Sequence, residues 1–209
     1  MSKFEETRVT TRVTFTSGSL TLEGAFHRGT SDLAAVVMHP HPLYGGDMHN
    51  HVVAALCAEL AAMGASTLRF NFRGVERSEG SFDDGRGEAD DARAAAAFVR
   101  ITAEVHSMVL AGYSFGAGVA AAIADDAEPD ALVLVSPPVR QAALSTAPGR
   151  PTLIVTGDRD QIAPAAELAR FEGPDCRVVA IPGADHSWWP GIDELRAHVA
   201  GFLRSLVPE

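Results

Sequence analysis

The sequence is poor in cysteine, in basic residues and in long apolar runs. Its 209 residues include only two cysteines, Cys57 and Cys176, which are far apart along the chain. This spacing excludes a disulfide framework and a clustered-thiol metal site. The 17 Lys and Arg residues are outnumbered by 27 Asp and Glu, which gives a formal charge of −10. Nucleic acids and anionic membranes are therefore not expected as partners, because binding either one requires a basic face.

Neither a leader nor a membrane anchor is evident in the sequence. Residues 1–16 are charged and have no apolar core, unlike a signal peptide. The apolar runs fall far short of the roughly 20 residues that a membrane span requires. We therefore expect a cytoplasmic protein. A hydrophobic content of 46% is ordinary for a globular protein, and the length predicts a single domain over residues 1–209, of undetermined oligomeric state.

Short β-branched runs alternate with longer stretches rich in alanine and leucine. Residues 10–15 and 20–27 alternate polar and apolar side chains around Ser17-Gly18, which predicts an antiparallel hairpin. The next runs are almost continuously apolar, as in parallel strands that are covered on both faces. These predicted strands are residues 33–38, 66–70, 108–111, 131–135, 152–155 and 177–181.

Helical patterns separate these strands. An initial hairpin followed by repeated strand–helix units predicts an α/β fold, with a doubly wound, mostly parallel sheet of about eight strands and helices on both faces. The acidic run at residues 83–91 is interpreted as a solvated loop leading into a helix. The predicted helices are residues 51–63, 88–99, 115–124, 164–171 and a last one that starts near Pro190.

A G-x-S-x-G motif at Gly112, Ser114 and Gly116 lies between a predicted strand and a helix of small residues. A nucleophile elbow places its serine in a strained backbone conformation and exposes Oγ above the sheet. The glycines leave room for the neighbouring strand and helix, and the helix N-terminus favours negative charge. Ser114 is therefore the predicted nucleophile. The alternative is a glycine-rich turn whose serine has only a structural role.

A serine hydroxyl becomes a useful nucleophile when a base takes its proton and an acid orients that base. In chain order the acid and then the histidine follow the serine, each on a loop after a late strand. His186 follows the strand predicted at residues 177–181, and we predict it as the base. Asp158 and Asp160 both follow the strand predicted at residues 152–155, and the order alone leaves either as the acid.

Two further stretches make the pattern more specific. One is HPHPLYGGDMHN at residues 39–50, and the other is NFRGVERSEG at residues 71–80, followed by Phe82-Asp83 and a glycine-rich turn at residues 85–88. With these motifs the chain resembles the α/β-hydrolases. More narrowly, it is similar to the small, cap-less bacterial serine hydrolases related to dienelactone hydrolase and the carboxylesterases. The resemblance covers nearly the whole core of that fold, and it implies a sheet without a lid domain.

The resemblance also bears on the choice of acid. In that family the acid is usually the Asp of G-x-x-D, followed closely by Val or Ile and by Pro. Gly157, Asp160, Ile162 and Pro164 match this pattern. The resemblance therefore implies Asp160 as the acid, with Asp158 as the alternative.

Two backbone N–H groups must stabilise the oxyanion that forms in such a reaction. Phe115, the residue after the nucleophile, is expected to supply one of them. The resemblance implies that His41 supplies the other. Tyr44 is the alternative, since Pro40 and Pro42 have no N–H to donate.

The resemblance implies hydrolysis of a small-molecule carboxylic ester or thioester through an acyl-enzyme, without a cofactor. The same residues could serve an acyl transferase or cyclase, or be retained in a non-catalytic binding member of the fold. A metal-site interpretation of His39, His41, His49 and His51 is disfavoured, because the intervening prolines break the regular strand that H-x-H spacing requires. We thus predict no metal site. Trp188 and Trp189 either wall an acyl pocket or anchor the last helix.

Overall fold

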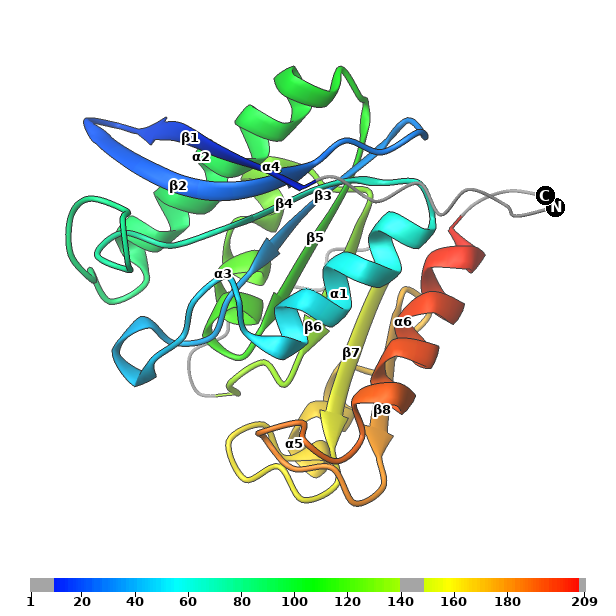
Figure 1. Ribbon diagram of the computed structural model, residues 1–209. Helices are drawn as coiled ribbons and strands as arrows, with labels where there is room; N and C mark the ends of the chain where they lie inside the picture. The colour runs from blue at the N-terminus through cyan, green and yellow to red at the C-terminus, as the bar shows by residue number, and fades with distance from the viewer. Residues whose placement is uncertain (1–9, 140–148, 207–209) are drawn as a thin grey trace, which may run out of the picture.

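The computed structural model describes residues 10–139 and 149–206, and strands within them form one eight-stranded sheet (Figure 1). The strand order is β1-β2-β4-β3-β5-β6-β7-β8. β2 is antiparallel to both β1 and β4, and the other neighbours are parallel. The prediction of a mostly parallel, doubly wound sheet is confirmed. The strands are β1 (Thr10–Ser17), β2 (Leu20–His27), β3 (Leu33–Met38), β4 (Ser66–Phe70), β5 (Ser107–Tyr113), β6 (Ala131–Val135), β7 (Thr152–Gly157) and β8 (Cys176–Ile181).

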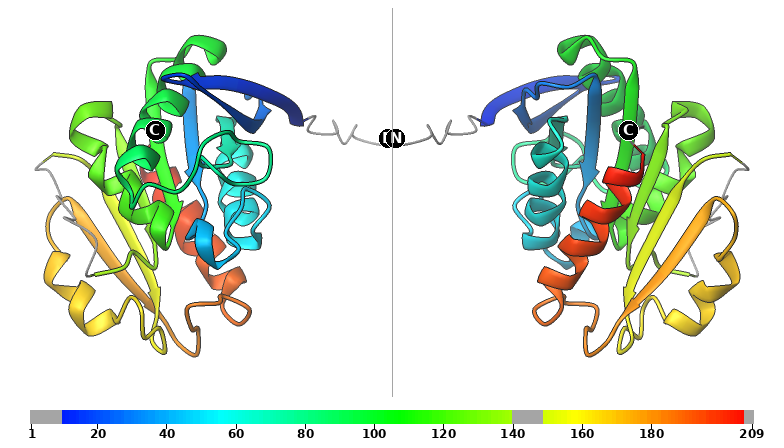
Figure 2. Two further views of the ribbon diagram at one scale, coloured as in Figure 1. Left: turned by 90° about the vertical axis from the view of Figure 1, so that its left-hand side faces the viewer. Right: turned by 90° about the vertical axis from the view of Figure 1, so that its right-hand side faces the viewer.

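Helices cover both faces of the sheet (Figure 2). α2 and α3 pack against one face, and α1 and α6 pack against the other. Alternate residues of a central strand serve the two layers: Val36 of β3 joins the first cluster and Val37 the second. None of the helices in the described residues is long and apolar enough to cross a bilayer. The helices are α1 (His51–Ala62), α2 (Arg86–Ala103), α3 (Phe115–Ala122), α4 (Ala124–Ala127), α5 (Ala165–Leu168) and α6 (Ile192–Ser205), with 3-10 turns at Pro42–Tyr44 and Ala169–Phe171.

The strand β8 differs from its prediction as a strand buried on both faces. It lies at the edge of the sheet and pairs within it with β7 alone. Cys176 and Ile181 at its two ends are buried, whereas Arg177 and Ala180 are exposed. Arg177 and Ala180 point to opposite faces, so both faces of this edge strand are partly exposed, although its apolar run resembles that of a central strand.

The acidic run at residues 83–91 is solvated only in part: Asp84 and Asp90 are exposed, whereas Glu88 and Asp91 are fully buried. Glu88 accepts the backbone N–H of Gly85 at 2.8 Å and so caps α2, which begins two residues before the predicted start. Asp91 accepts two hydrogen bonds from the Arg73 guanidinium, at 2.8 and 3.0 Å, and the Arg73 N–H at 3.0 Å. Both buried charges are thereby satisfied, and the ion pair ties the loop after β4 to α2.

The parallel strands bring the candidate site residues to one edge of the sheet. β3, β5, β7 and β8 run in the same direction, so the loops that follow them leave from the same side. Those loops carry the histidine-rich stretch at residues 39–50, Ser114, residues 158–164 and residues 182–191. Segments up to about 150 residues apart in sequence therefore meet at this edge.

Candidate active site

Ser114 occupies a sharp turn between β5 and α3. Its φ of 53° lies in the left-handed region, which is rare for a residue with a side chain. A Cβ on Gly112 would lie 2.4 Å from the backbone of Gly116, and one on Gly116 would lie 2.5 Å from the carbonyl oxygen of Met38. Both flanking positions therefore require glycine. The Ser114 N–H donates to the carbonyl of Val135 at 2.8 Å, which ties the turn to the end of β6.

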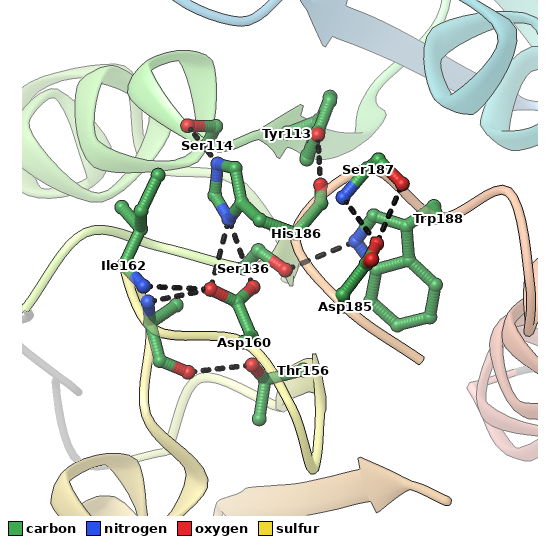
Figure 3. Close-up of polar contacts among 11 residues, drawn as sticks. Tyr113, Ser114, Ser136, Thr156, Asp160, Ile162, Asp185, His186, Ser187 and Trp188 are labelled. Atoms are coloured by element: carbon green, nitrogen blue, oxygen red, sulfur yellow. Dashed lines mark hydrogen bonds and ion pairs between the residues drawn. The ribbon is translucent and has the colours of Figure 1, made fainter. Parts of the chain in front are cut away.

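A continuous chain of hydrogen bonds runs from Ser114 through His186 to Asp160 (Figure 3). His186, on the loop after β8, places Nε2 2.9 Å from Ser114 Oγ and Nδ1 2.8 Å from Asp160 Oδ2. When Nδ1–H donates to the carboxylate, Nε2 is free to accept the serine proton. The three side chains predicted from the sequence thus lie in contact, in the order that proton transfer from the serine requires.

The carboxylate of Asp160 is held in place from several sides. Its Oδ1 accepts the backbone N–H groups of Ile162 at 2.9 Å and Ala163 at 2.8 Å. Burial alone would raise the pKa of Asp160, but hydrogen bonds from His186, Ala163 and Ser136 outweigh burial and bring the pKa below its usual value. Asp160 is therefore ionised at neutral pH, as an acid that orients an imidazole must be.

The other candidate acid, Asp158, has different hydrogen-bond partners from those of Asp160. It is exposed, and its Oδ1 accepts the backbone N–H of Gly183 at 2.7 Å, across the loop that follows β8. Of the two carboxylates that the chain order leaves open, Asp160 is the one that contacts His186. Asp158 instead helps to shape the loop on which His186 lies.

Tyr113 fixes the backbone at His186. Its hydroxyl donates to the carbonyl oxygen of His186. This contact joins the residue before the nucleophile to the base, and the sequence analysis missed it. Burial raises the pKa of Tyr113, so this hydroxyl keeps its proton and remains a donor. The signal in the sequence was weak, because Tyr113 is a variable position of G-x-S-x-G.

Two backbone N–H groups beside Ser114 have no acceptor. Within residues 10–139 and 149–206, neither the N–H of Phe115 nor that of His41 donates a hydrogen bond. The N–H of Tyr44, in contrast, donates to the carbonyl of His41 at 3.1 Å. Of the two candidates in that loop, His41 has an N–H that is free to meet an oxyanion, and Tyr44 does not.

The side chain and backbone of His41 contact several neighbouring groups. The imidazole of His41 contacts the rings of Phe82 and Phe115, with centroids 4.8 and 4.9 Å apart respectively. Its Nδ1 accepts the backbone N–H of Leu43 at 3.2 Å. A Cβ on Gly46 would lie 2.1 Å from the carbonyl oxygen of Pro40, so the loop closes on itself only with glycine there. These contacts favour the observed conformation of the His41 backbone.

Nearby, His39 is fully buried and uses both ring nitrogens. Its Nε2 accepts the N–H of Phe72 at 3.1 Å, so the proton is on Nδ1, which donates to the carbonyl of Pro40 at 2.6 Å. Burial lowers the pKa of His39 to about 4. This histidine therefore joins the loops after β3 and β4 as a neutral side chain, and neither nitrogen is left for a metal ion.

The other members of the histidine cluster diverge. His49 is exposed, and His51 stacks on Trp189 with ring centroids 4.4 Å apart. No three His, Cys, Asp or Glu side chains in the described ranges gather as metal ligands would. The cluster is a shaped turn followed by the start of α1.

Because His39 binds a proton less readily in the folded state, it makes stability depend on pH. Between about pH 6.5 and pH 4, His39 becomes protonated in the unfolded chain but stays neutral in the folded chain, so the free energy of unfolding falls as the pH falls. We expect this residue to contribute a loss of about 3 kcal/mol over that range. In His39→Gln, urea unfolding at a series of pH values should show a shallower fall than in the wild type. Equal slopes would contradict the prediction.

Trp188 and Trp189, which the sequence analysis assigned either to a pocket wall or to an anchor of the last helix, have different environments. Trp188 is fully buried among side chains of α6 and donates its indole N–H to Ser136 Oγ at 3.0 Å. Trp189 is 76% exposed and stacks on His51. Neither residue belongs to the described lining of the cavity at Ser114. Trp188 is an anchor for the last helix.

A cavity of about 650 Å³ opens beside Ser114 and His186. It is lined by both candidate oxyanion residues and by a mainly apolar wall from the loops after β3, β6 and β7. The apolar part of that wall includes Tyr44, Pro138, Val139, Ile162 and Pro164.

Comparisons with known proteins agree with this fold. A family model for the alpha/beta hydrolase domain matches residues 34–198. The chain belongs to the α/β-hydrolase family. It is 36% identical over 200 residues to the uncharacterized protein RP471 of Rickettsia prowazekii, covering 87% of this chain and 84% of that protein.

Solved structures similar to this α/β-hydrolase include serine hydrolases, one of which is described as having no lid. It is similar to XC6422 of Xanthomonas campestris, described as an α/β serine hydrolase without lid, with a TM-score of 0.88, 30% identity, and coverage of 100% of this chain and 99% of that one. A serine hydrolase homologue from Coxiella burnetii gives a TM-score of 0.83 and 32% identity, over 98% of this chain and 100% of that one. The family and the cap-less fold expected from the motifs are both confirmed.

Proposed function

We propose that this α/β-hydrolase cleaves a carboxylic ester or thioester of a small molecule through an acyl-enzyme on Ser114. The observation that carries the proposal is the contact of Ser114 Oγ with His186 Nε2, at 2.9 Å, within a chain that ends on the ionised Asp160. A hydroxyl whose proton has an acceptor at this distance can attack a carbonyl carbon as the proton leaves.

The reaction has two halves that use the same groups. Ser114 Oγ bonds to the carbonyl carbon, its proton moves to His186 Nε2, and the N–H groups of Phe115 and His41 donate to the oxyanion. His186 then returns the proton to the departing alkoxide or thiolate, and the acyl-enzyme remains. In the second half, water gives its proton to His186 and attacks the same carbon, which releases the acid and restores Ser114.

A fluorophosphonate and a set of model esters test the proposal directly. We expect the wild type to form a stoichiometric adduct on the peptide containing Ser114, and to hydrolyse p-nitrophenyl esters and acyl thioesters of graded chain length. The kcat/KM value should rise with pH over the range where histidine side chains lose their proton, about 5.5–7.5. EDTA should leave the rate unchanged. Chelator-sensitive hydrolysis that survives Ser114→Ala would overturn the serine mechanism.

The charge around the cavity favours neutral or cationic substrates over anionic ones. Glu167 lines the cavity, and none of the described lining residues is Lys or Arg. His41 also lines the cavity. Burial lowers the pKa of His41, whereas the nearby carboxylates of Glu88 and Asp84 act to raise that pKa. The cavity is therefore lined or influenced by carboxylates, in a chain whose formal charge is −10.

We expect a p-nitrophenyl butyrate to be hydrolysed several-fold faster, in kcat/KM, than the succinate monoester of similar size. An interaction between exposed charges contributes a few tenths of a kcal/mol to about 1 kcal/mol to the binding of the anionic ester. Glu167→Gln should therefore reduce the ratio of the two kcat/KM values about two- to fivefold, and Glu167→Lys should reduce this ratio further. Added salt should narrow it as well. Glu194→Lys, an exposed carboxylate outside the cavity lining, is the matched control. An anionic ester preferred by the wild type would contradict this prediction.

A further inference from the structure

Two fully buried polar side chains behind Asp160 have no part in the reaction as proposed. They are Ser136, directly after β6, and Trp188, two residues after His186. The indole N–H of Trp188 donates to Ser136 Oγ at 3.0 Å. Both residues have positive φ values, 47° for Ser136 and 60° for Trp188, which a residue with a side chain adopts only when its surroundings compel it.

The hydroxyl of Ser136 is fully buried and already accepts one hydrogen bond. The indole N–H of Trp188 donates to a lone pair of Ser136 Oγ. Because a buried hydroxyl also requires an acceptor for its own proton, Ser136 must donate to another group. Figure 3 places Ser136 next to Asp160, on the side of the carboxylate away from Ile162. Against the effect of burial, the hydrogen bond from Ser136 acts with those from His186 and Ala163 to lower the pKa of Asp160.

We propose that Ser136 is a positioning residue for Asp160, and that Trp188 sets the direction in which the Ser136 hydroxyl donates. Backbone N–H groups of Ile162 and Ala163 donate to one oxygen of the carboxylate, and Ser136 lies on the side of the other oxygen, toward which its hydroxyl would donate (Figure 3). A donor on this second oxygen fixes the carboxylate toward His186 Nδ1. It also withdraws negative charge from the carboxylate, which then stabilises a protonated imidazole less strongly.

This inference rests on the proposed function, and Ser136→Ala tests it. The variant should lower kcat about tenfold, the effect of one lost hydrogen bond, and change KM little. The acid limb of the pH profile of kcat/KM should move to higher pH, because the carboxylate that has lost its donor holds the proton on His186 more tightly. Trp188→Phe keeps most of the ring packing but lacks the N–H, and should shift the profile in the same direction by less.

Two matched variants test whether a shift of the pH profile is caused by the loss of the Ser136 hydroxyl. Ser136→Gly removes the hydroxyl and also relieves the positive φ, so it should shift the profile as Ser136→Ala does. Trp189→Phe changes the exposed neighbour and should leave the profile unchanged. If Ser136→Ala is folded by circular dichroism and its profile coincides with that of the wild type, Ser136 has only a structural role and the inference fails.

A measurement without substrate keeps this test distinct from that of the proposed function. The titration of His186, followed by NMR of the imidazole, should move to higher pH in Ser136→Ala whether or not an ester is hydrolysed. A wild type that does not react with fluorophosphonate would contradict the proposed function. An NMR titration that is the same in Ser136→Ala and the wild type would contradict the positioning role.

Discussion

Ser114→Ala is expected to abolish ester hydrolysis, with a loss of about 10⁴-fold or more in kcat. The remaining groups cannot replace the hydroxyl, because His186 Nε2 lies 2.9 Å from Oγ and would then face a methyl group. The fold should be unaffected, since the substitution keeps Cβ at the strained φ of 53° and removes one oxygen. Steady-state hydrolysis of p-nitrophenyl butyrate, with thermal unfolding alongside, measures both expectations.

The adduct provides the second half of this test. Fluorophosphonate treatment followed by mass spectrometry should modify the wild type on the peptide containing Ser114 and leave Ser114→Ala unmodified. Cys57 is not expected to compete, because burial raises the pKa of its thiol to about 12 and keeps it protonated. Full activity in Ser114→Ala, or an adduct on another residue, would contradict the assignment.

Asp160→Asn is expected to lower kcat by about 10⁴-fold, the second-largest effect. An amide that presents N–H to the ring favours the imidazole tautomer with its proton on Nε2, and Ser114 then has no acceptor. The same change removes a charge that is buried and hydrogen-bonded to Ile162 and Ala163, so some loss of stability should accompany it. Activity should therefore be expressed per folded molecule, with the folded fraction taken from urea titration.

Asp158→Asn is the matched control for this result. Asp158 is exposed and accepts one N–H, from Gly183, which an asparagine oxygen can also accept. We expect less than a tenfold loss in kcat. A reversed ranking of the two variants would make Asp158 the acid, with the fold and the reaction class unchanged.

Strands were predictable from the sequence where burial on both faces produced unbroken apolar runs. The predicted strands at residues 33–38, 66–70 and 131–135 coincide with β3, β4 and β6. The same reasoning overstated the burial of β8, because an apolar run does not distinguish a central strand from an edge strand whose faces are partly exposed. The start of α2 was missed because its cap comes from Glu88, whose side chain reaches back to Gly85 inside what looked like a solvated acidic loop.

The candidate site was predictable to the extent that each residue follows a strand at one edge of the sheet. That rule predicted Ser114 and His186 and limited the acid to Asp158 or Asp160, and the family resemblance favoured Asp160. The rule also applied to Ser136, directly after β6, but a single serine carries no pattern of its own. The partner that gives Ser136 its role, Trp188, is 52 residues away, and only the folded chain brings the two together.

The groups proposed to react are divided between two stretches of the chain. The nucleophile and both N–H donors come before the connection between β6 and β7, while the acid and the base come after it. A chain cut in that connection would yield two inactive fragments, one with an unactivated serine and one with a base that has no nucleophile. Turnover would return when β7 pairs again with β6, from Leu132 and Thr152 to Val135 and Val155. Fused to two proteins that associate, the fragments would make a split-enzyme reporter whose colour signal follows the association.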